Sequence, residues 1–340
     1  MRGRTCRFFP AFDILLKETI GGISLNAAAG SAVNRPRKSI LKRLGENIRN
    51  HPLLYLLALP VVAYYIIFCY WPMYGVVIAF QNFKPALGIA GSKWVGLKHF
   101  DKFINGMYFG RLVRNTLSIN LGMLLVGFPL PILFALLLNE LPSRGFQRVT
   151  QTVTYMPHFV STVVVCGLML QFSGSTGILT RLLSYFGLKE TNLFTVPSYF
   201  QPLYIGMNVW QNMGWDSIIF FAALTAIDPE QHEAALIDGA GRWRRMIHVT
   251  IPGIMPTVVI LLIMRIGSLM SLGWDQIVLL YNERVYETAD VISTYVYRTG
   301  LTKYEYSFGS AVGLFNSLIN ILLLVGANTI SRKVNDTSLW

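Results

Sequence analysis

The sequence contains few charged residues and few cysteines. Of its 340 residues 14% are charged, three are Cys and 53% are hydrophobic, and the mean hydropathy is +0.47. Three cysteines provide no disulfide framework and no zinc-binding spacing. A soluble domain cannot hide so many apolar residues behind so few charged ones. The composition therefore excludes an ordinary soluble globular protein and indicates an integral membrane protein.

Several catalytic signatures are also missing. No Gly is followed directly by Lys, which excludes a Walker A phosphate-binding loop. His232 and Glu233 are not followed by a second His at zinc-protease spacing, and no Gly-x-Ser-x-Gly nucleophile motif occurs. These absences argue against an intramembrane hydrolase, the enzyme alternative. The sequence predicts no metal site and no cofactor on this chain, so that any ATP and Mg²⁺ are bound by partner subunits.

Six windows are long and apolar enough to cross a membrane. A hydrocarbon core of ~30 Å needs roughly 20 apolar residues in one helix. Four windows hold no charged residue, and the other two hold one each, Asp216 and Arg265. The fifth window is expected to be the weakest, because its charge lies near its middle. The predicted spans are residues 53–71, 116–138, 149–172, 199–227, 254–272 and 308–330.

The fold class that follows is an all-α integral membrane protein. Residues 1–52 are predicted to form a cytoplasmic tail and residues 53–340 the transmembrane domain. Basic residues precede the first span, and the positive-inside rule places such residues in the cytoplasm. Both termini are therefore predicted to be cytoplasmic. The net charge of +12 is explained by this topology and by anionic lipid, so no nucleic-acid partner is expected. The basic residues are Arg35, Arg37, Lys38, Lys42, Arg43 and Arg49.

The segment between the fourth and fifth spans predicts a short cytoplasmic helix-turn-helix. Asp228 can cap a helix that runs from Pro229 to about Ile237, with Gln231 at the position of a capping-box partner. Gly239 and Gly241 tolerate left-handed dihedrals, so the chain can turn there and begin a second short helix. Such a compact projection suits a groove on a partner protein.

The same segment carries a family resemblance. Glu233-Ala-Ala, followed by Gly239 and then by Pro252, resembles the coupling loop of ATP-binding-cassette importer permeases, and Asp238-Gly-Ala is similar to the carbohydrate (maltose-type) branch. The likeness extends from about residue 53 to residue 340. Three further segments resemble polysaccharide-type permeases, which import oligosaccharide fragments. They begin at Tyr74 (YGVVIAFQNFK), Tyr286 (YETADVISTYVYRTGL) and Ala311 (AVGLFN).

This resemblance implies a set of partners. The coupling loop would dock in a cleft of the ATPase subunit, whereas the alternative is a capped loop helix without a partner. Related importers combine a second, usually non-identical permease, two ATPase subunits and an extracytoplasmic solute-binding protein in the bacterial cytoplasmic (inner) membrane. The segments 81–114 and 274–307, rich in aromatic and charged residues, would receive that binding protein, unless they form only an interfacial aromatic belt. The implied coupling residues are Glu233, Ala234, Ala235, Asp238, Gly239 and Pro252.

Polar residues inside the spans are candidates for the solute pathway. A charge at mid-bilayer costs roughly 2.5–3.5 kcal/mol, so Asp216 and Arg265 should face protein or water, where they can pair with each other. Amides match sugar hydroxyls, but interhelical hydrogen bonding explains them as well. His158, beside a proline, is interpreted as a satisfied residue near a helix kink. The pathway candidates are Asn208, Gln211, Asn212, Asp216, Arg265, Asn316 and Asn320.

Together these features predict the permease subunit of a binding-protein-dependent importer. It would move an oligosaccharide or polysaccharide across the cytoplasmic membrane, driven by ATP hydrolysis in separate subunits. Arg265 and the basic external segments are compatible with an acidic glycan. The alternative is an ion-coupled secondary transporter, which predicts two related halves with broken helices. Six spans without evident duplication favour the first interpretation.

Overall fold

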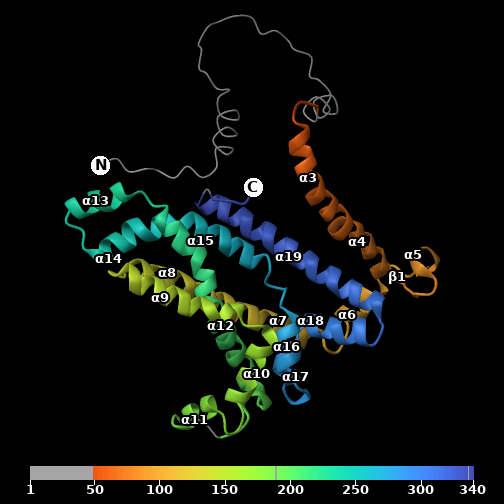
Figure 1. Cartoon of the computed structure of the whole chain (residues 1–340). Helices are drawn as coiled ribbons and strands as arrows, with labels where there is room; N and C mark the ends of the chain where they lie inside the picture. Colours follow the sequence, from red (N-terminus) through yellow and green to blue (C-terminus); the bar gives the residue numbers. More distant parts are fainter. Residues whose placement is uncertain (1–48, 188–189, 336) are drawn as a thin grey trace, which may run out of the picture. The chain divides into compact units, whose positions relative to one another are not determined.

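The computed structural model describes residues 49–187, 190–335 and 337–340, and most of the predicted tail lies outside these residues. The chain divides into two compact units, Met1–Trp71 and Pro72–Trp340. The described residues are mostly helical (Figure 1). The prediction of an all-α architecture is confirmed at this level.

In the first unit, α3 (Pro52–Tyr64) continues without a break into a π-helical segment, Tyr65–Tyr70. Pro52 lies at the start of α3, where the missing N–H costs no helical hydrogen bond. Neither segment buries a single residue, and apolar side chains cover all sides. A helix that is apolar all round is suited to a lipid environment.

The second unit contains a short hairpin and many helices. Strand β1 (Gln81–Asn82) pairs antiparallel with β2 (Lys93–Trp94), with Gln81 opposite Trp94. The helices are α4 (Trp71–Met73, beginning at the unit boundary), α5 (Gly88–Gly91), α6 (Lys98–Ile104), α7 (Phe109–Gly122), α8 (Pro129–Asn139), α9 (Arg144–Tyr155), α10 (Thr162–Phe172), α11 (Ile178–Ser184), α12 (Pro197–Thr225), α13 (Pro229–Ile237), α14 (Arg242–Arg245), α15 (Ile251–Ile266), α16 (Trp274–Leu280), α17 (Tyr286–Ala289), α18 (Ile292–Val296) and α19 (Tyr306–Asn335).

Among the described residues, four helices are long and apolar enough to cross a membrane: Pro52–Phe80, Phe109–Asn139, Arg242–Ile266 and Tyr306–Val334. A fifth candidate is the pair Arg144–Phe159 and Thr162–Phe172, bent by 96°. These candidates confirm a multi-pass membrane protein, while the count of six spans stays a prediction.

Helix α12 is long enough to span, at 29 residues, yet it is not among these candidates, because amides and Asp216 lower its hydropathy. The expectation that the fifth predicted span is the weakest is therefore wrong. That span also ends earlier than predicted, since α15 stops at Ile266 and a turn follows.

Helix α12 packs against α8, α9 and α15. Its approach to α9 depends on Gly214, because a Cβ at this position would overlap the backbone of Thr154. Towards its C-terminal end, Phe220 and Leu224 join Ile254 of α15 in a buried cluster that also includes Ala135 and Leu136 of α8. These contacts hold three long helices together along one side of the second unit.

The predicted helix-turn-helix is present as α13 and α14. The Asp228 carboxylate accepts a hydrogen bond from the Glu230 N–H at 3.0 Å, and α13 ends before Gly239, which has a φ of +77°. Two details of the prediction are wrong. Gln231 makes no capping-box bond in the described structure, and Gly241 is extended (φ −67°, ψ 170°) because it is the N-cap of α14.

The second helix of this projection is not a separate unit. Helix α14 passes through a π-helical segment, Met246–Thr250, directly into α15. The candidate span Arg242–Ile266 therefore begins within the projection. Helices α14 and α15 therefore form one continuous helix, which a turn separates from α13.

Candidate functional site

The amides of α12 share one helix face, as their spacing predicts. The side-chain amides of Asn208 and Asn212 donate to the carbonyls of Tyr204 and Asn208 at 2.9 and 3.1 Å. The side-chain oxygen (Oδ1) of Asn212 lies 2.9 Å from Nδ1 of His158. These bonds fix the orientation of the two amides.

These amides line a cavity of about 330 Å³, which we call the polar pocket. Asn208, Asn212, Asp216 and Arg265 were all candidates from the sequence, and the structure brings them together here. Its wall is formed by residues from α7, the π-helical segment Met123–Gly127, α12, α15, the turn after α15 and α16. The full lining is Asn120, Met123, Gly127, Tyr204, Asn208, Val209, Asn212, Met213, Asp216, Arg265, Ser271, Leu272, Gly273 and Gln276.

Sequence reasoning missed four polar residues of this wall: Asn120, Tyr204, Ser271 and Gln276. Tyr204 lies on α12 four positions before Asn208, so helical spacing could have identified it, whereas Asn120, Ser271 and Gln276 lie on other segments. The hydroxyl of Tyr204 lies 3.2 Å from the side-chain amide oxygen (Oε1) of Gln276, so these two residues contact each other. Only their position on the cavity identifies Asn120, Ser271 and Gln276.

Gln211 lies behind the polar pocket rather than on it. Its amide is buried and donates to the Val160 carbonyl at 3.3 Å, and its carbonyl oxygen lies 3.5 Å from the Gln276 amide. Gln211 therefore supports Gln276, which does line the cavity.

Asn316 and Asn320 lie on α19 and do not line the polar pocket. The side-chain oxygen (Oδ1) of Asn320 accepts a hydrogen bond from the Met270 N–H at 2.9 Å, and the side-chain amide nitrogen of Asn320 donates to the Ser271 hydroxyl at 2.8 Å. Asn320 thus holds the turn that follows α15. The side-chain oxygen (Oδ1) of Asn316 is buried without a hydrogen-bond partner in the described structure.

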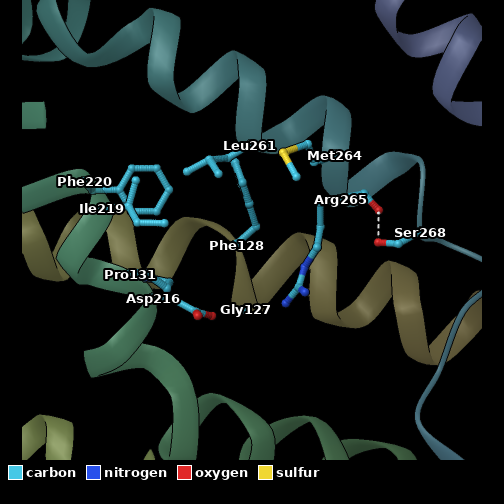
Figure 2. Close-up of a pocket in the computed structure, with 10 residues that line it drawn as sticks. All are labelled: Gly127, Phe128, Pro131, Asp216, Ile219, Phe220, Leu261, Met264, Arg265 and Ser268. Carbon is cyan, nitrogen blue, oxygen red and sulfur yellow. Dashed lines mark hydrogen bonds between the residues drawn. The ribbon is translucent and has the colours of Figure 1, made fainter. Parts of the chain in front are cut away.

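A second cavity, of about 380 Å³, adjoins the polar pocket and is mostly apolar. We call it the apolar pocket. It shares Gly127, Asp216 and Arg265 with the polar pocket. Figure 2 shows the carboxylate of Asp216 and the guanidinium of Arg265 directed into the same space. They form no ion pair within 4.0 Å in the described structure, so the pairing expected from the sequence is not found.

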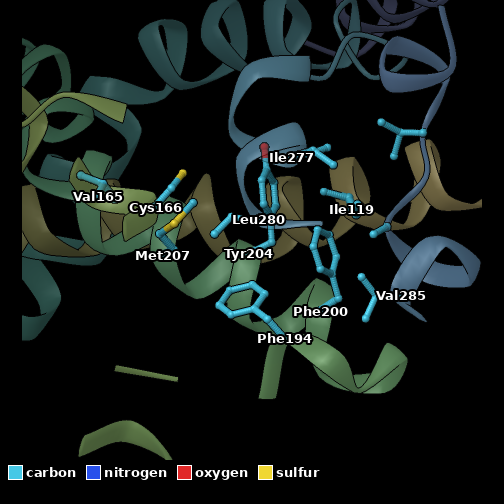
Figure 3. Close-up of a cluster of buried hydrophobic side chains, with 12 residues drawn as sticks. Ile119, Val165, Cys166, Phe194, Phe200, Tyr204, Met207, Ile277, Leu280 and Val285 are labelled. Carbon is cyan, nitrogen blue, oxygen red and sulfur yellow. The ribbon is translucent and has the colours of Figure 1, made fainter. Parts of the chain in front are cut away.

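Part of α12 is also held in a buried cluster. Phe200, Tyr204 and Met207 pack with Phe194 and with Ile277 of α16 (Figure 3). The rings of Phe200 and Tyr204 stack at 6.1 Å. This packing fixes the rotation of α12 and so directs its amide face into the polar pocket.

His158 lies at the break between the two halves of the bent helix pair. Its ring stacks on Trp215 with centroids 4.4 Å apart, and its Nδ1 contacts Asn212. The interpretation of His158 as a satisfied residue near a kink is confirmed. Within the described chain, no group of three or more His, Cys, Asp and Glu residues could hold a metal ion.

The implied coupling residues lie on an open surface. Helix α13 buries none of its residues, and Glu233 and Ala234 are exposed while Ala235 is half-buried. Asp238, Gly239 and Pro252 are also exposed. Exposed apolar side chains flank them, and Ile237 is 86% and Trp243 73% exposed. This face has the composition of a protein-binding surface.

Aromatic and charged residues singled out in the segment 274–307 meet around Asp290. This carboxylate is fully buried, and it pairs with Arg298 at 2.8 Å and with Arg111 of α7 at 3.2 Å. The Arg298 guanidinium also lies over the rings of Tyr286 and Tyr295. Burial lowers the pKa of Arg298, but the hydrogen bonds and charge of Asp290 outweigh it and hold that pKa above its ordinary value. We call these residues the Asp290 cluster.

Comparison with known proteins identifies the family. Residues 127–336 match the model of the binding-protein-dependent transport system inner membrane component. The chain is 43% identical to protein LplB of Bacillus subtilis over 288 residues, which is 84% of this chain and 91% of LplB. It is 41% identical to the polygalacturonan/rhamnogalacturonan transport system permease protein YteP of the same organism, over 89% of this chain and 95% of YteP.

Two solved structures agree with this result. One is a bacterial ABC transporter involved in the import of the acidic polysaccharide alginate, with a TM-score of 0.78 and 41% identity over 86% of this chain and 99% of the matched one. The other is the alginate transporter in complex with its periplasmic protein bound to an alginate pentasaccharide, with a TM-score of 0.79 and 40% identity over 87% and 100%.

The chain therefore belongs to the inner-membrane permease family of binding-protein-dependent ABC importers. Family membership confirms the predicted carbohydrate-permease resemblance and a transport component in place of an enzyme. The comparisons give no support to an ion-coupled secondary transporter.

Proposed function

We propose that this chain forms one half of the membrane passage of an ABC importer for an acidic oligosaccharide. The observation that supports the proposal most directly is the polar pocket, where amides and two charged side chains converge between α7, α12 and α15. Sugars are bound by such planar amides and charges in a concave site. Two relatives are described as transporters of alginate and of polygalacturonan, which are acidic polysaccharides. Arg265 supplies a cation that matches the carboxylates of such sugars.

The passage is completed by six spans in this proposal. The four apolar helices and the bent pair provide five, and α12 provides the other, with its polar face turned inward. Both termini and the α13–α14 projection then lie in the cytoplasm of the bacterial cell, which agrees with the basic residues before the first span. Asp216 and Arg265 face the passage rather than lipid.

The α13–α14 projection is the coupling element. Its Glu233-Ala-Ala segment and Gly239 dock in a cleft of an ATPase subunit, where Asp238 and Pro252 flank the contact. The exposure of this face and its direct continuation into α15 support this role. ATP and Mg²⁺ are bound by the two partner ATPase chains, and closure of that pair moves α14 and α15 as one rod.

The remaining partners are a second permease and an extracytoplasmic solute-binding protein. The second permease closes the other half of the passage and differs in sequence from this chain. The binding protein contacts the hairpin and the segment around the Asp290 cluster, whose exposed rings include Trp94 and Trp274. The alginate transporter complexed with its periplasmic protein supports this arrangement.

Uptake by the reconstituted complex tests the function. The chain is assembled in liposomes with its companion permease, ATPase and binding protein, and uptake of a labelled trigalacturonide is measured. We expect uptake to require ATP on the side of the liposome membrane where the ATPase subunits lie. Uptake should persist when ionophores collapse the proton and sodium gradients. Uptake that needs an ion gradient and no ATP would overturn the proposal.

A further inference from the structure

The polar and apolar pockets follow one another along three elements. On α12, Asn208 and Asn212 line the polar pocket, Asp216 lines both, and Ile219 and Phe220 line the apolar pocket. The three elements thus pass from the polar to the apolar wall at one level. That level is marked by the three shared residues, Gly127, Asp216 and Arg265.

The other two elements also pass from one pocket to the other, although α15 does so in the opposite chain direction. Asn120 of α7 and Met123 of the π-helical segment Met123–Gly127 precede Gly127, and Phe128 and Pro131 follow it on the apolar side. On α15 and the turn after it, Leu261 lines the apolar pocket, Arg265 lines both, Ser268 lines the apolar pocket, and Ser271 lines the polar pocket. The apolar pocket is nearer to the α13–α14 projection, because α12 leads into α13 and α15 follows α14.

The charged groups at this level have no fixed partner. The carboxylate of Asp216 and the guanidinium of Arg265 form neither a hydrogen bond nor an ion pair in the described structure; only the Arg265 backbone carbonyl is engaged, by Ser268. Charged side chains within membrane spans are costly to bury, and their presence there indicates a functional site. Both therefore remain available to a charged solute.

We infer that Asp216 and Arg265 act as a charge-selective junction with opposite effects on an anionic sugar. Arg265 binds a carboxylate of the solute as it leaves the polar pocket. Asp216 faces the same space and repels that carboxylate, which weakens the bound state and lets the solute pass into the apolar pocket. Conduction requires binding that is favourable enough for entry and weak enough for exit. Asp216 is thus a release residue, and this role rests on the proposed sugar passage.

The junction predicts that two single variants move binding in opposite directions. Asp216→Asn removes the repulsion and should slow dissociation of a fluorescent trigalacturonide from the solubilised permease complex by about tenfold. Its maximal uptake rate should fall because the sugar is trapped. Arg265→Gln should raise the Kd by about tenfold or more, because a charge-assisted hydrogen bond is lost.

The methyl ester of the same trigalacturonide is the matched ligand, because it keeps the sugar skeleton and lacks the charge. Its binding should be the same in wild type, Asp216→Asn and Arg265→Gln. Thr225→Val, at the end of α12 and outside both pockets, is the matched protein control and should behave as wild type. Binding is measured without the solute-binding protein, so that its own preference does not contribute.

Two results would overturn the junction. One is dissociation from Asp216→Asn that is unchanged or faster than from wild type. The other is an equal effect of the variants on acid and ester, which would indicate a structural role. Either result with normal ATP-dependent uptake by wild type leaves the proposed function in place. Absence of any sugar uptake by the wild-type complex would instead reject the function itself.

Discussion

At the residue scale, the Asp290 cluster joins distant parts of the chain. The buried carboxylate accepts from Arg111 on α7 and from Arg298 eight positions along the sequence. Asp290→Asn keeps the shape of the side chain and leaves two guanidinium groups without their anion. Loss of one partner from a buried charge pair costs roughly 3–5 kcal/mol, and here we expect about 2 kcal/mol because both arginines are about a quarter exposed.

Thermal unfolding of the purified chain in detergent measures this effect. Glu283→Gln removes an exposed carboxylate from the same segment and is the matched control. It should leave the midpoint unchanged, whereas Asp290→Asn should lower it. Equal midpoints for the two variants would show that the cluster does not stabilise the fold.

A second residue-scale prediction concerns pH. Burial lowers the pKa of His99 below 6.5, aided by the nearby Lys102 and Lys98 and opposed by Glu305 and by the contact of its Nε2 with the Gln81 carbonyl at 3.1 Å. The folded state binds the proton less readily than the unfolded chain. The contribution of neutral His99 to the free energy of unfolding is therefore complete above pH 6.5. It is lost as the pH falls through the lower pKa of the folded state.

Thermal midpoints from pH 8 to pH 5 test this linkage. The wild type should lose stability on the acidic side more steeply than His99→Gln, which cannot take up the proton. Parallel pH curves for the two proteins would show that His99 does not contribute to the acid sensitivity.

At the element scale, the contact of α12 with α9 depends on a missing side chain. Gly214→Ala would place a Cβ into the Thr154 backbone, which cannot yield as a flexible side chain can. Forced overpacking of this kind costs typically about 1–3 kcal/mol. Gly206→Ala on the same helix meets nothing within 4 Å and is the matched control. We expect a lower unfolding midpoint for Gly214→Ala alone, and a reversed order would contradict the packing described.

The α13 helix provides a second prediction at this scale. Glu233→Ala should reduce ATP-driven uptake severalfold while the protein remains inserted, because the proposed contact with the ATPase loses its charge. Glu230→Ala removes an exposed carboxylate from the same helix, one turn away, and should retain uptake. Uptake is measured together with the stimulation of ATP hydrolysis by the sugar-bound binding protein, which should fall in the same variant. Equal stimulation in both variants would reject Glu233 as a coupling residue.

At the scale of the whole molecule, the proposed topology places segments on opposite sides of the membrane. In a variant without its three native cysteines, Glu230→Cys and Glu283→Cys introduce one exposed thiol each. A membrane-impermeant maleimide should label position 283 in spheroplasts and position 230 only after permeabilisation. The reverse pattern would invert the chain and reject the coupling role of α13.

Local patterns predicted local elements well. The cap at Asp228, the proline after it and Gly239 predicted a helix over residues 229–237, and α13 has these bounds. Details that depend on neighbours were predicted less well. Gly241 is extended because α14 begins directly after it, and α14 continues into α15, which a pattern of residues cannot reveal.

The candidate site shows the same division. The i, i+4 spacing of Asn208 and Asn212 predicted a shared face on α12, and that face lines the polar pocket. The matching spacing of Asn316 and Asn320 on α19 does not: Asn320 binds the turn at Met270 and Ser271 instead. Helical periodicity determines which residues share a face, but it does not determine what that face contacts.

The sequence by itself determined the membrane class, the transport family and the α13 helix, because hydropathy, capping and a contiguous motif are properties of short segments. Only the tertiary structure decided which polar residues meet at one cavity and that Asp216, Arg265 and Gly127 stand between a polar and an apolar pocket. Those residues come from elements more than 40 positions apart. Their meeting depends on how buried side chains pack the helices together, and no local pattern records that packing.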